Sequence, residues 1–396
     1  MTTEKVKIVL KSGKDQSLKR FHPWVFSGAI KKMYGAPAEG DLVNVYSNKD
    51  EFLGTGHYQI GSITVRIVSF KEVEPGYDFW KSKVQSAWNL RKMLGFAGNE
   101  QTNVFRLIHA EGDGMPGLIV DFYNGTAVMQ THSVGMHLIR AQLVKAMKEV
   151  LGDFLKAVYY KSDKTLPFKA DLENEDGYLF GNDSENIVME YGLRFTVDWE
   201  EGQKTGFFVD QRENRKLVET YSKDRDVLNM FCYTGGFSFY AMQGGAKSVH
   251  SVDASGKAID LTRKNVELNF PGDKRHEALV ADGFEYLKDI QDKYDLIILD
   301  PPAFAKHRKT LPQALKGYKR INTRAFEQIR KGGILFTFSC SQVVSKERFR
   351  ETVFSAAAIA GKNVRILHQL NQPADHPVNI YHPESEYLKG LVLYVE

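Results

Sequence analysis

Residues 227–238 read VLNMFCYTGGFS, and this stretch decides the fold of the C-terminal half of the chain. Its apolar start is typical of a buried strand. The paired glycines that follow allow the backbone to approach a ligand closely at the N-terminus of a helix. Their spacing is not the G-x-G-x-x-G of dinucleotide sites, which weakens a pyrophosphate interpretation. The stretch therefore predicts a strand, a ligand-binding loop and a helix; a plain helix-entry turn is the alternative for the glycines.

Strand and helix patterns alternate from about residue 200 onward. Seven apolar segments are predicted as strands: 227–231, 248–252, 278–281, 296–299, 334–338, 364–370 and 391–395. Helical segments separate the earlier strands, which is typical of a parallel sheet with helices on both faces. No helix separates the last two, which indicates an antiparallel hairpin at one edge. The expected fold class is α/β, with a seven-stranded Rossmann-like sheet.

Two smaller domains are expected before this sheet. Residues 1–74 read as short strands punctuated by glycines, which is typical of a small β-barrel or sandwich. Residues 75–185 mix helical and strand patterns and predict an α+β domain. The third domain, 186–396, is expected to begin with a hairpin turned at Tyr191-Gly192.

Composition limits the cellular compartment in which the protein is expected. The 396 residues carry a net charge of +4 and two cysteines, which excludes a disulfide framework and favours a reducing cytoplasm. The first seven residues lack the apolar core of a signal peptide. No uncharged apolar run approaches the length of a membrane span, so no membrane partner is expected.

Acidic residues follow the second and third predicted strands. Asp253 lies 18 residues beyond Gly235, where an acid can hydrogen-bond a ribose diol. Asp282 and Gly283 could flank an adenine. Together with the glycine loop they predict an adenosine-containing ligand. The expected contacts in this part of the chain are Phe231, Tyr233, Thr234, Gly235, Ser238, Asp253, Ala254, Asp282, Gly283 and Asp300.

The fourth strand ends in residues 300–304, DPPAF. Its two prolines remove two N–H donors and leave carbonyl groups that can accept hydrogen bonds. The Asp300 carboxylate beside them could hold the amino-bearing edge of a nucleobase, and Phe304 could stack on its face. A plain turn is the alternative.

Cys340 follows the fifth predicted strand, in the run 336–341, FTFSCS. Strand ends of a doubly wound sheet gather around one crevice, so Cys340 and Asp300 are expected to reach the same place. A thiol and a carboxylate there suggest covalent chemistry on a small planar group. The alternative is that Cys340 is a small buried hydrophobe, as free cysteines usually are.

Residues 306–331 form a basic segment with nine Lys or Arg residues and one Glu, a net charge of +8. Such a segment beside a strand end suits a polyanion such as nucleic acid. A solvated helix face is the alternative. The residues expected to bind the substrate are Pro301, Phe304, Lys306, Arg308, Lys309, Lys319 and Arg320.

Taken together, the glycine loop, the acids at 253 and 282 and the DPP sequence resemble the successive motifs of class I S-adenosylmethionine-dependent methyltransferases. Further segments resemble the PUA-containing ribosomal large-subunit methyltransferase I family over essentially the whole chain. These are FHPWVFSG at 21–28, RLIHAEGDGMPGL at 106–118, KTGFFVDQRENR at 204–215 and ADHP at 374–377.

The resemblance implies a PUA domain at 1–74, a cytoplasmic enzyme and 5-methylcytosine formation in 23S rRNA. It implies S-adenosylmethionine as cofactor and no metal, and it allows a homodimer. In this family pattern Cys340 holds the nucleophile position and Asp300 the base-binding position. Cofactor contacts are also implied near the methionine end for Lys204, Thr205, Phe207 and Asp210. Other RNA cytosine-5 methyltransferases have a second cysteine in the Pro-containing motif, where this chain has Ala303.

The chemistry explains why a thiol is needed. Carbon 5 of cytosine is a poor nucleophile, and thiolate addition at carbon 6 would make it enamine-like. An ordinary thiol has a pKa near 8.5; the basic segment and the sulfonium charge of the cofactor could stabilise the thiolate. The base that removes the carbon 5 proton is not identified by the sequence. Two alternatives remain, an exocyclic-amine RNA methyltransferase using DPPAF and a non-catalytic RNA-binding or assembly factor.

Overall fold

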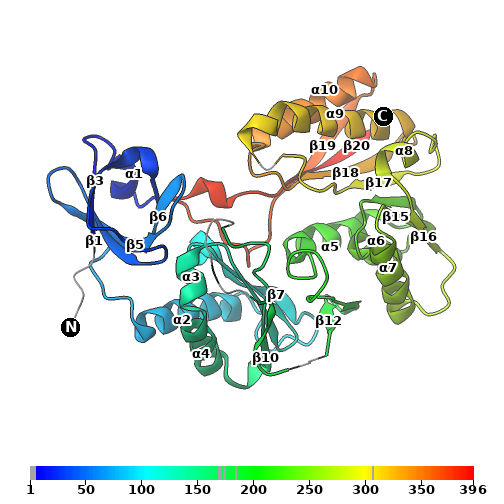
Figure 1. Ribbon diagram of the computed structural model, residues 1–396. Coiled ribbons are helices and arrows are strands. Elements are labelled where there is room, and N and C mark those ends of the chain that lie inside the picture. The colour runs from blue at the N-terminus through cyan, green and yellow to red at the C-terminus, as the bar shows by residue number, and fades with distance from the viewer. Residues whose placement is uncertain (1–5, 168–171, 173–174, 183–184, 306) are drawn as a thin grey trace. The chain divides into compact units, whose positions relative to one another are not determined.

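The computed structural model describes residues 6–167, 172, 175–182, 185–305 and 307–396. The chain divides into two compact units (Figure 1). The first unit comprises residues up to 188 together with 197–209 and 374–385. The second comprises 189–196, 210–373 and 386–396. The predicted three-domain boundaries near 74 and 185 stay predictions.

The first unit begins with a six-stranded sheet of order β2-β6-β5-β4-β1-β3. Strand β4 alternates buried and partly exposed side chains, because successive residues point to opposite faces. The buried side chains include Ile8, Val43, Val45 and Val65. The elements are β1 (Val6–Leu10), α1 (Gln16–Lys19), β2 (Trp24–Phe26), η1 (Ser27–Ala29), β3 (Ile30–Tyr34), β4 (Leu42–Tyr46), β5 (Phe52–Tyr58) and β6 (Ile63–Ser69).

A five-stranded sheet of order β11-β10-β9-β8-β7 follows in the same unit. Apolar side chains of α2 and α4, such as Trp80 and Met147, share one buried core with this sheet. The expected α+β character is therefore present. The elements are α2 (Tyr77–Met93), β7 (Val104–His109), η2 (Ala110–Asp113), β8 (Leu118–Tyr123), β9 (Thr126–Thr131), α3 (Val134–Leu138), α4 (Arg140–Leu151), η3 (Gly152–Phe154), β10 (Ala157–Tyr160) and β11 (Gly177–Phe180).

The second unit contains a seven-stranded sheet of order β16-β15-β14-β17-β18-β20-β19. Strand β20 runs antiparallel to both β18 and β19, which is the expected edge hairpin. The other pairs are parallel. The strands are β14 (Asp226–Met230), β15 (Ser248–Asp253), β16 (His276–Val280), β17 (Leu296–Leu299), β18 (Gly333–Ser339), β19 (Val364–Leu370) and β20 (Lys389–Val395).

Helices connect these strands, and their apolar faces join the sheet core around Leu299, Tyr318 and Leu335. None of the described helices is long and apolar enough to cross a membrane. The helical elements are η4 (Val209–Gln211), α5 (Arg212–Tyr221), α6 (Gly236–Gln243), α7 (Gly256–Asn269), α8 (Gly283–Tyr286), η5 (Arg308–Thr310), α9 (Leu311–Gln328), α10 (Lys346–Ile359) and η6 (Pro383–Ser385).

A short hairpin of β12 (Ile187–Glu190) and β13 (Leu193–Thr196) precedes this sheet, as predicted. Its turn residue Tyr191 has a positive φ of 49° beside Gly192. Glu190 is fully buried and accepts two hydrogen bonds of 2.7 Å from Arg215 of α5. Breaking such a buried pair typically costs about 3–5 kcal/mol. The pair therefore fixes the last residue of β12 to the helix that leads into β14.

Strand order decides where the site forms. Strand β17 lies between β14 and β18, with Met230 opposite Leu299 and Leu299 opposite Thr337. All three strands are parallel, so their carboxyl ends meet at one edge of the sheet. Asp300 and Cys340 both leave the sheet at this edge.

Candidate active site at the carboxyl edge of the seven-stranded sheet

The loop after β14 is held in an unusual backbone conformation. Phe231, Tyr233 and Gly235 have φ values of 59°, 49° and 83°. Non-glycine residues rarely adopt positive φ, and such strain concentrates at ligand sites. A Cβ on Gly235 would lie 2.6 Å from Thr262 Cγ2 and 2.8 Å from Phe239 Cζ. The second glycine, Gly236, begins α6. The first of the paired glycines, Gly235, therefore lies where a larger side chain would not fit.

Asp253 at the end of β15 fixes this loop. Its carboxylate accepts the backbone N–H of Tyr233 at 3.0 Å and that of Ser255 at 2.9 Å. A carboxylate has further lone pairs, so it can still accept from a ribose hydroxyl. Ala254 follows on the surface. The strained loop, Gly235 and the acid together fit an adenosine-containing cofactor.

Ser238 and Thr234, which were predicted to contact the cofactor, are both buried. Ser238 is fully buried, and its hydroxyl bonds the Asn229 amide at 2.9 Å and the Ser251 hydroxyl at 2.6 Å. Thr234 is 4% exposed. Ser238 therefore ties the start of α6 to β14 and β15. The contact of Ser238 and Thr234 with a cofactor stays a prediction.

Asp282 and Gly283 have clear local roles after β16. The Asp282 carboxylate caps α8 by accepting the N–H groups of Phe284 and Glu285 at 2.9 and 3.0 Å. A Cβ on Gly283 would lie 2.7 Å from the ring of Phe231. The two strand ends therefore touch through Phe231, which places the two predicted adenosine-binding loops side by side.

The DPPAF segment follows β17. Pro301 is buried, whereas Asp300 and Phe304 are partly exposed. The Phe304 ring lies 4.6 Å from the Tyr318 ring and 6.0 Å from the Phe284 ring, between centroids. Phe304 is therefore supported by two other aromatic rings, and base stacking by Phe304 and contact by Pro301 stay predictions.

Cys340 follows β18 and is partly exposed, whereas the other cysteine, Cys232, is 7% exposed. Burial raises the pKa of Cys232 strongly, so that thiol stays protonated. The next residue, Ser341, is anchored by its hydroxyl, which accepts the Ala305 N–H at 3.3 Å and lies 3.0 Å from the Tyr318 hydroxyl. The segments after β17 and β18 are therefore tied together through Ser341, the residue that follows Cys340.

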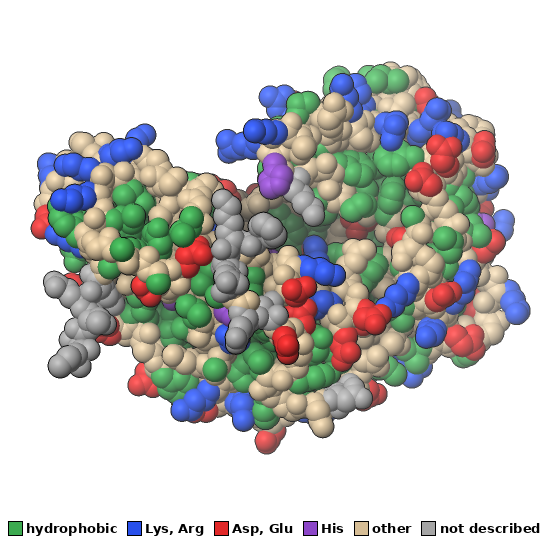
Figure 2. Space-filling model, in the orientation of Figure 1, with side chains coloured by type: hydrophobic (Ala, Val, Ile, Leu, Met, Phe, Trp, Pro, Cys, Tyr) green, Lys and Arg blue, Asp and Glu red, His purple; other side chains and the backbone are tan. Residues whose placement is uncertain are grey.

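The basic segment continues into η5 and α9. Arg308, Lys309 and Arg320 are exposed, Lys319 is partly exposed, and Lys306 lies outside the described residues. Figure 2 shows Lys and Arg side chains on the surface over α9 and α10. The Arg320 guanidinium lies 4.1 Å from the Phe284 ring centroid, a cation–π contact.

Some cations of the basic segment form ion pairs within the protein. Arg324 pairs with Glu327 at 2.9 Å, and Arg330 pairs with Asp226 at 2.6 Å at the opposite end of β14. The cations nearest the DPPAF segment are therefore the better candidates for a polyanion.

Residues 204–210 divide between the two units. Lys204, Thr205 and Phe207 belong to the first unit, where the Thr205 hydroxyl bonds Asp121 at 2.6 Å and Tyr123 at 2.9 Å. Asp210 belongs to the second and accepts the Tyr387 hydroxyl at 2.6 Å. Their contact with a cofactor stays a prediction.

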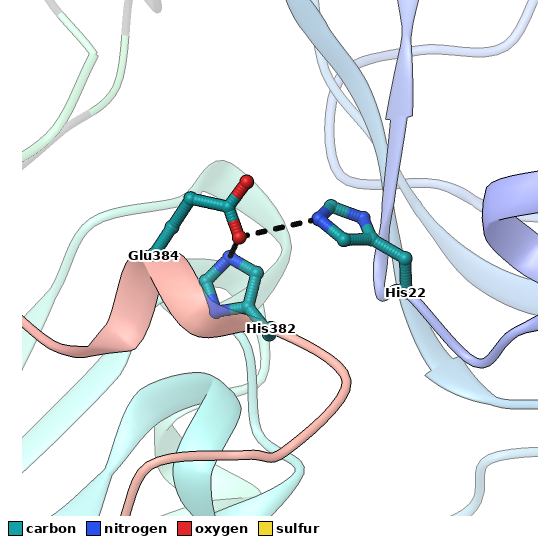
Figure 3. A group of neighbouring side chains, drawn as sticks. All are labelled: His22, His382 and Glu384. Atoms are coloured by element: carbon teal, nitrogen blue, oxygen red, sulfur yellow. Dashed lines mark hydrogen bonds and ion pairs between the residues drawn. The ribbon is translucent and has the colours of Figure 1, made fainter.

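One group among the described side chains has the spacing of metal ligands: His22, His382 and Glu384 of the first unit (Figure 3). His22 Nε2 and His382 Nε2 lie 3.4 and 3.7 Å from Glu384 Oε2. The backbone N–H of Trp24 donates to His22 Nδ1, so the neutral ring carries its proton on Nε2. A metal at Nε2 would displace that proton to Nδ1 and so break the hydrogen bond from Trp24. The geometry fits a hydrogen-bonded junction better than a metal centre.

The sequence did not identify three residues around Cys340: Tyr318, Ser341 and Lys389. Lys389 is 5% exposed, and its Nζ donates hydrogen bonds of 2.6 Å to the carbonyl oxygens of Ser341 and Val344. One signal could have found it, because a lysine beside the apolar run 391–395 is unusual in a buried strand.

Comparisons with known proteins agree with this architecture. A family model described as S-adenosylmethionine-dependent methyltransferase matches residues 168–383, and one described as a PUA-like domain matches residues 8–70. The chain is 41% identical to a ribosomal RNA large subunit methyltransferase I from Alteromonas mediterranea, over 97% of this chain and 98% of that protein. It is 38% identical to a protein of the same name from Aeromonas hydrophila, over 98% of each.

Two solved structures are similar over their whole length. A putative SAM-dependent methyltransferase from Streptococcus mutans has a TM-score of 0.85 at 25% identity, covering 98% of this chain and 100% of that chain. A putative methyltransferase complexed with SAH has a TM-score of 0.86 at 26% identity, with the same coverage. The fold and the cofactor predicted from the sequence are thereby confirmed.

Proposed function

Because this chain belongs to the ribosomal RNA large subunit methyltransferase I family, we propose that it forms 5-methylcytosine in 23S ribosomal RNA, with Cys340 as the nucleophile. One observation carries this proposal. Cys340 and Asp300 follow neighbouring parallel strands, β18 and β17, and so leave the sheet at the same edge. A thiol is not required for transfer to an amino group, but carbon 5 of cytosine needs activation.

The residues divide the work as follows. The Cys340 thiolate forms a bond to carbon 6 of the cytosine, and the electron pair of the C5–C6 double bond moves to carbon 5. Asp300 accepts the exocyclic N–H of the base and holds its edge. After transfer, a base removes the carbon 5 proton, the Sγ–C6 bond breaks and the double bond re-forms. The thiolate is regenerated, so Cys340 is ready for another turnover.

When bound, S-adenosylmethionine supplies the methyl group. The loop after β14 would hold its adenosine, with Gly235 allowing close approach and Asp253 accepting from the ribose. Asp282 and Gly283 would lie on its adenine side, since Gly283 packs against Phe231 of the same loop.

A base inside a helix cannot reach such a site, so the target cytosine must leave its stack. Single-stranded or partly unfolded RNA therefore suits the site best. Arg308, Lys309, Lys319 and Arg320 would contact the RNA backbone, and affinity should fall as salt rises. Lys306 is assigned the same role from its sequence position.

The test uses 23S rRNA from a strain that lacks the gene, incubated with cofactor and either wild type or Cys340→Ala. Bisulfite sequencing should reveal one newly protected cytosine with wild type and none with the variant. Cys232→Ala is the matched control and should keep activity, because Cys232 is a buried packing residue. Unchanged transfer by Cys340→Ala, with mass spectrometry placing methyl on an amino group, would favour an exocyclic-amine methyltransferase.

A further inference from the structure

Lys389 is a buried cation directly beside the proposed nucleophile. It is the first residue of β20 and lies opposite Ser339, the last residue of β18, in the antiparallel register. Cys340 follows Ser339 in the chain. A lysine this deeply buried is uncommon, because an ammonium loses its hydration on burial. Some local interaction must therefore offset that cost.

The hydrogen bonds of Lys389 offset part of the hydration that its ammonium group loses on burial. Nζ donates to the carbonyl oxygens of Ser341 and Val344, each at 2.6 Å. Both carbonyls belong to the turn at residues 341–344, which directly follows Cys340, so one side chain closes this turn. Bonds from a charged donor are short and roughly twice as strong as neutral ones. The turn is thus held from β20 on one side and by Tyr318 and Ala305 on the other.

The charges around Lys389 act in both directions, and burial remains the largest effect on its pKa. Burial lowers the pKa of Lys389 to about 8, and Lys346 acts in the same direction. Cys340 and Glu386 act in the opposite direction, because negative charge on either favours the ammonium. The side chain is therefore mostly protonated at pH 7. By reciprocity, a cation that a thiolate stabilises also stabilises that thiolate.

We propose that Lys389 is a positioning residue that stabilises the thiolate of Cys340 and fixes the turn that follows it. This inference rests on the proposed function, in which Cys340 is the nucleophile. The thiol proton leaves to solvent and the ammonium keeps its own protons, so Lys389 acts through its charge and its hydrogen bonds. It does not act as the base of the reaction.

The test measures how fast Cys340 reacts with iodoacetamide as a function of pH, by mass spectrometry of the Cys340 peptide in the full-length protein without RNA. Only the thiolate reacts, so the pH midpoint reports thiolate formation. In the wild type we expect this midpoint well below the 8.5 of an ordinary cysteine. A wild-type midpoint at or above 8.5 would overturn the proposal without any variant. Cys232 is the internal reference for a buried thiol.

Two variants separate charge from structure. Lys389→Met should slow alkylation at pH 7 about tenfold, the effect of raising the midpoint by about one unit. Lys389→Arg keeps the charge and should retain most of the rate. Tyr318→Phe removes only the hydroxyl near Ser341 and should leave the midpoint in place. Equal midpoints for wild type and a folded Lys389→Met protein would refute the charge effect.

This readout is independent of methylation. If Cys340→Ala still methylates cytosine at carbon 5, the proposed function fails, while the alkylation profile can still show that Lys389 stabilises the thiolate. If all variants have the same pH midpoint while Cys340→Ala is inactive, only the proposed role of Lys389 fails.

Discussion

Asp253 accepts the backbone N–H of Tyr233 at 3.0 Å, so the acid at the end of β15 holds the strained loop after β14. The same carboxylate bonds the N–H of Ser255. Asp253 is thus both a predicted ribose acceptor and the anchor of the loop that would contact the adenosine. Binding and local stability are therefore expected to depend on one side chain.

Replacing Asp253 by Ala should weaken cofactor binding by tenfold to a hundredfold, because a hydrogen bond to a charged acceptor contributes about 1.5–3 kcal/mol. Isothermal titration calorimetry with S-adenosylmethionine measures this directly. Asp260→Asn is the matched control, since Asp260 lies on α7 in an exposed pair with Arg263. Equal affinities for wild type and Asp253→Ala would remove Asp253 from the cofactor site.

Gly235→Ala should destabilise the second unit and impair cofactor binding. The alanine would have to adopt the φ of 83° that Gly235 has, and its Cβ would overlap Thr262 and Phe239. Overpacking of this kind costs about 1–3 kcal/mol. Urea denaturation measures the loss. Gly256→Ala is the control, because nothing lies within 4 Å of a Cβ at that helical position. There alanine should be neutral or slightly stabilising, and a similar loss at both positions would contradict the close packing at Gly235.

The strands of the seven-stranded sheet follow from the sequence because the central ones, such as β17 and β18, are apolar runs and the outer ones lie between clear helix and turn signals. Leu296–Leu299 and Val364–Leu370 begin and end at the residues that the pattern predicts. The short strands β2 and β3 in the first unit have no such signal. Trp24–Phe26 has three residues, and four of the five side chains of β3 are exposed. Their pairing depends on neighbouring strands.

The candidate site was predicted only in part, for a physical reason. Local patterns reveal residues at strand ends, such as Asp253, Asp300 and Cys340. They do not reveal partners brought together from distant positions, such as Lys389 and Ser341. Residues 374–385 illustrate the same point, since they belong to the first unit while both flanks belong to the second. Asp375 there is fully buried and accepts the Arg106 N–H at 2.9 Å.

Acid should destabilise the first unit through His57. This side chain is 4% exposed and stacks on Trp80, and burial lowers its pKa to about 4, with a smaller effect of Arg66. In the unfolded chain His57 binds a proton near pH 6.5, whereas in the folded state it binds one only near pH 4. The stabilising contribution is therefore complete above pH 6.5 and is lost as pH falls towards 4. The full loss amounts to about 3 kcal/mol.

His57→Phe keeps a ring beside Trp80 and removes the titration. Unfolding measured between pH 7 and pH 4 should show a shallower loss of stability, by about one proton. His132 and His137 of the first unit, whose pKa values burial also lowers to about 4, should keep part of the slope in both proteins. His307→Gln is the exposed control. A slope that is the same in wild type and His57→Phe would mean that His57 charges normally in the folded protein.

The most direct test of the central claim uses RNA that carries 5-fluorocytosine at the target position, together with S-adenosylmethionine. Fluorine replaces the proton that must leave carbon 5, so the covalent intermediate cannot resolve. We predict a denaturant-resistant enzyme–RNA adduct whose RNA fragment maps to Cys340 by peptide mass spectrometry. Cys340→Ala should form none, and Cys232→Ala should form as much as wild type. An adduct at another residue, or none while the normal RNA is still methylated, would contradict the account.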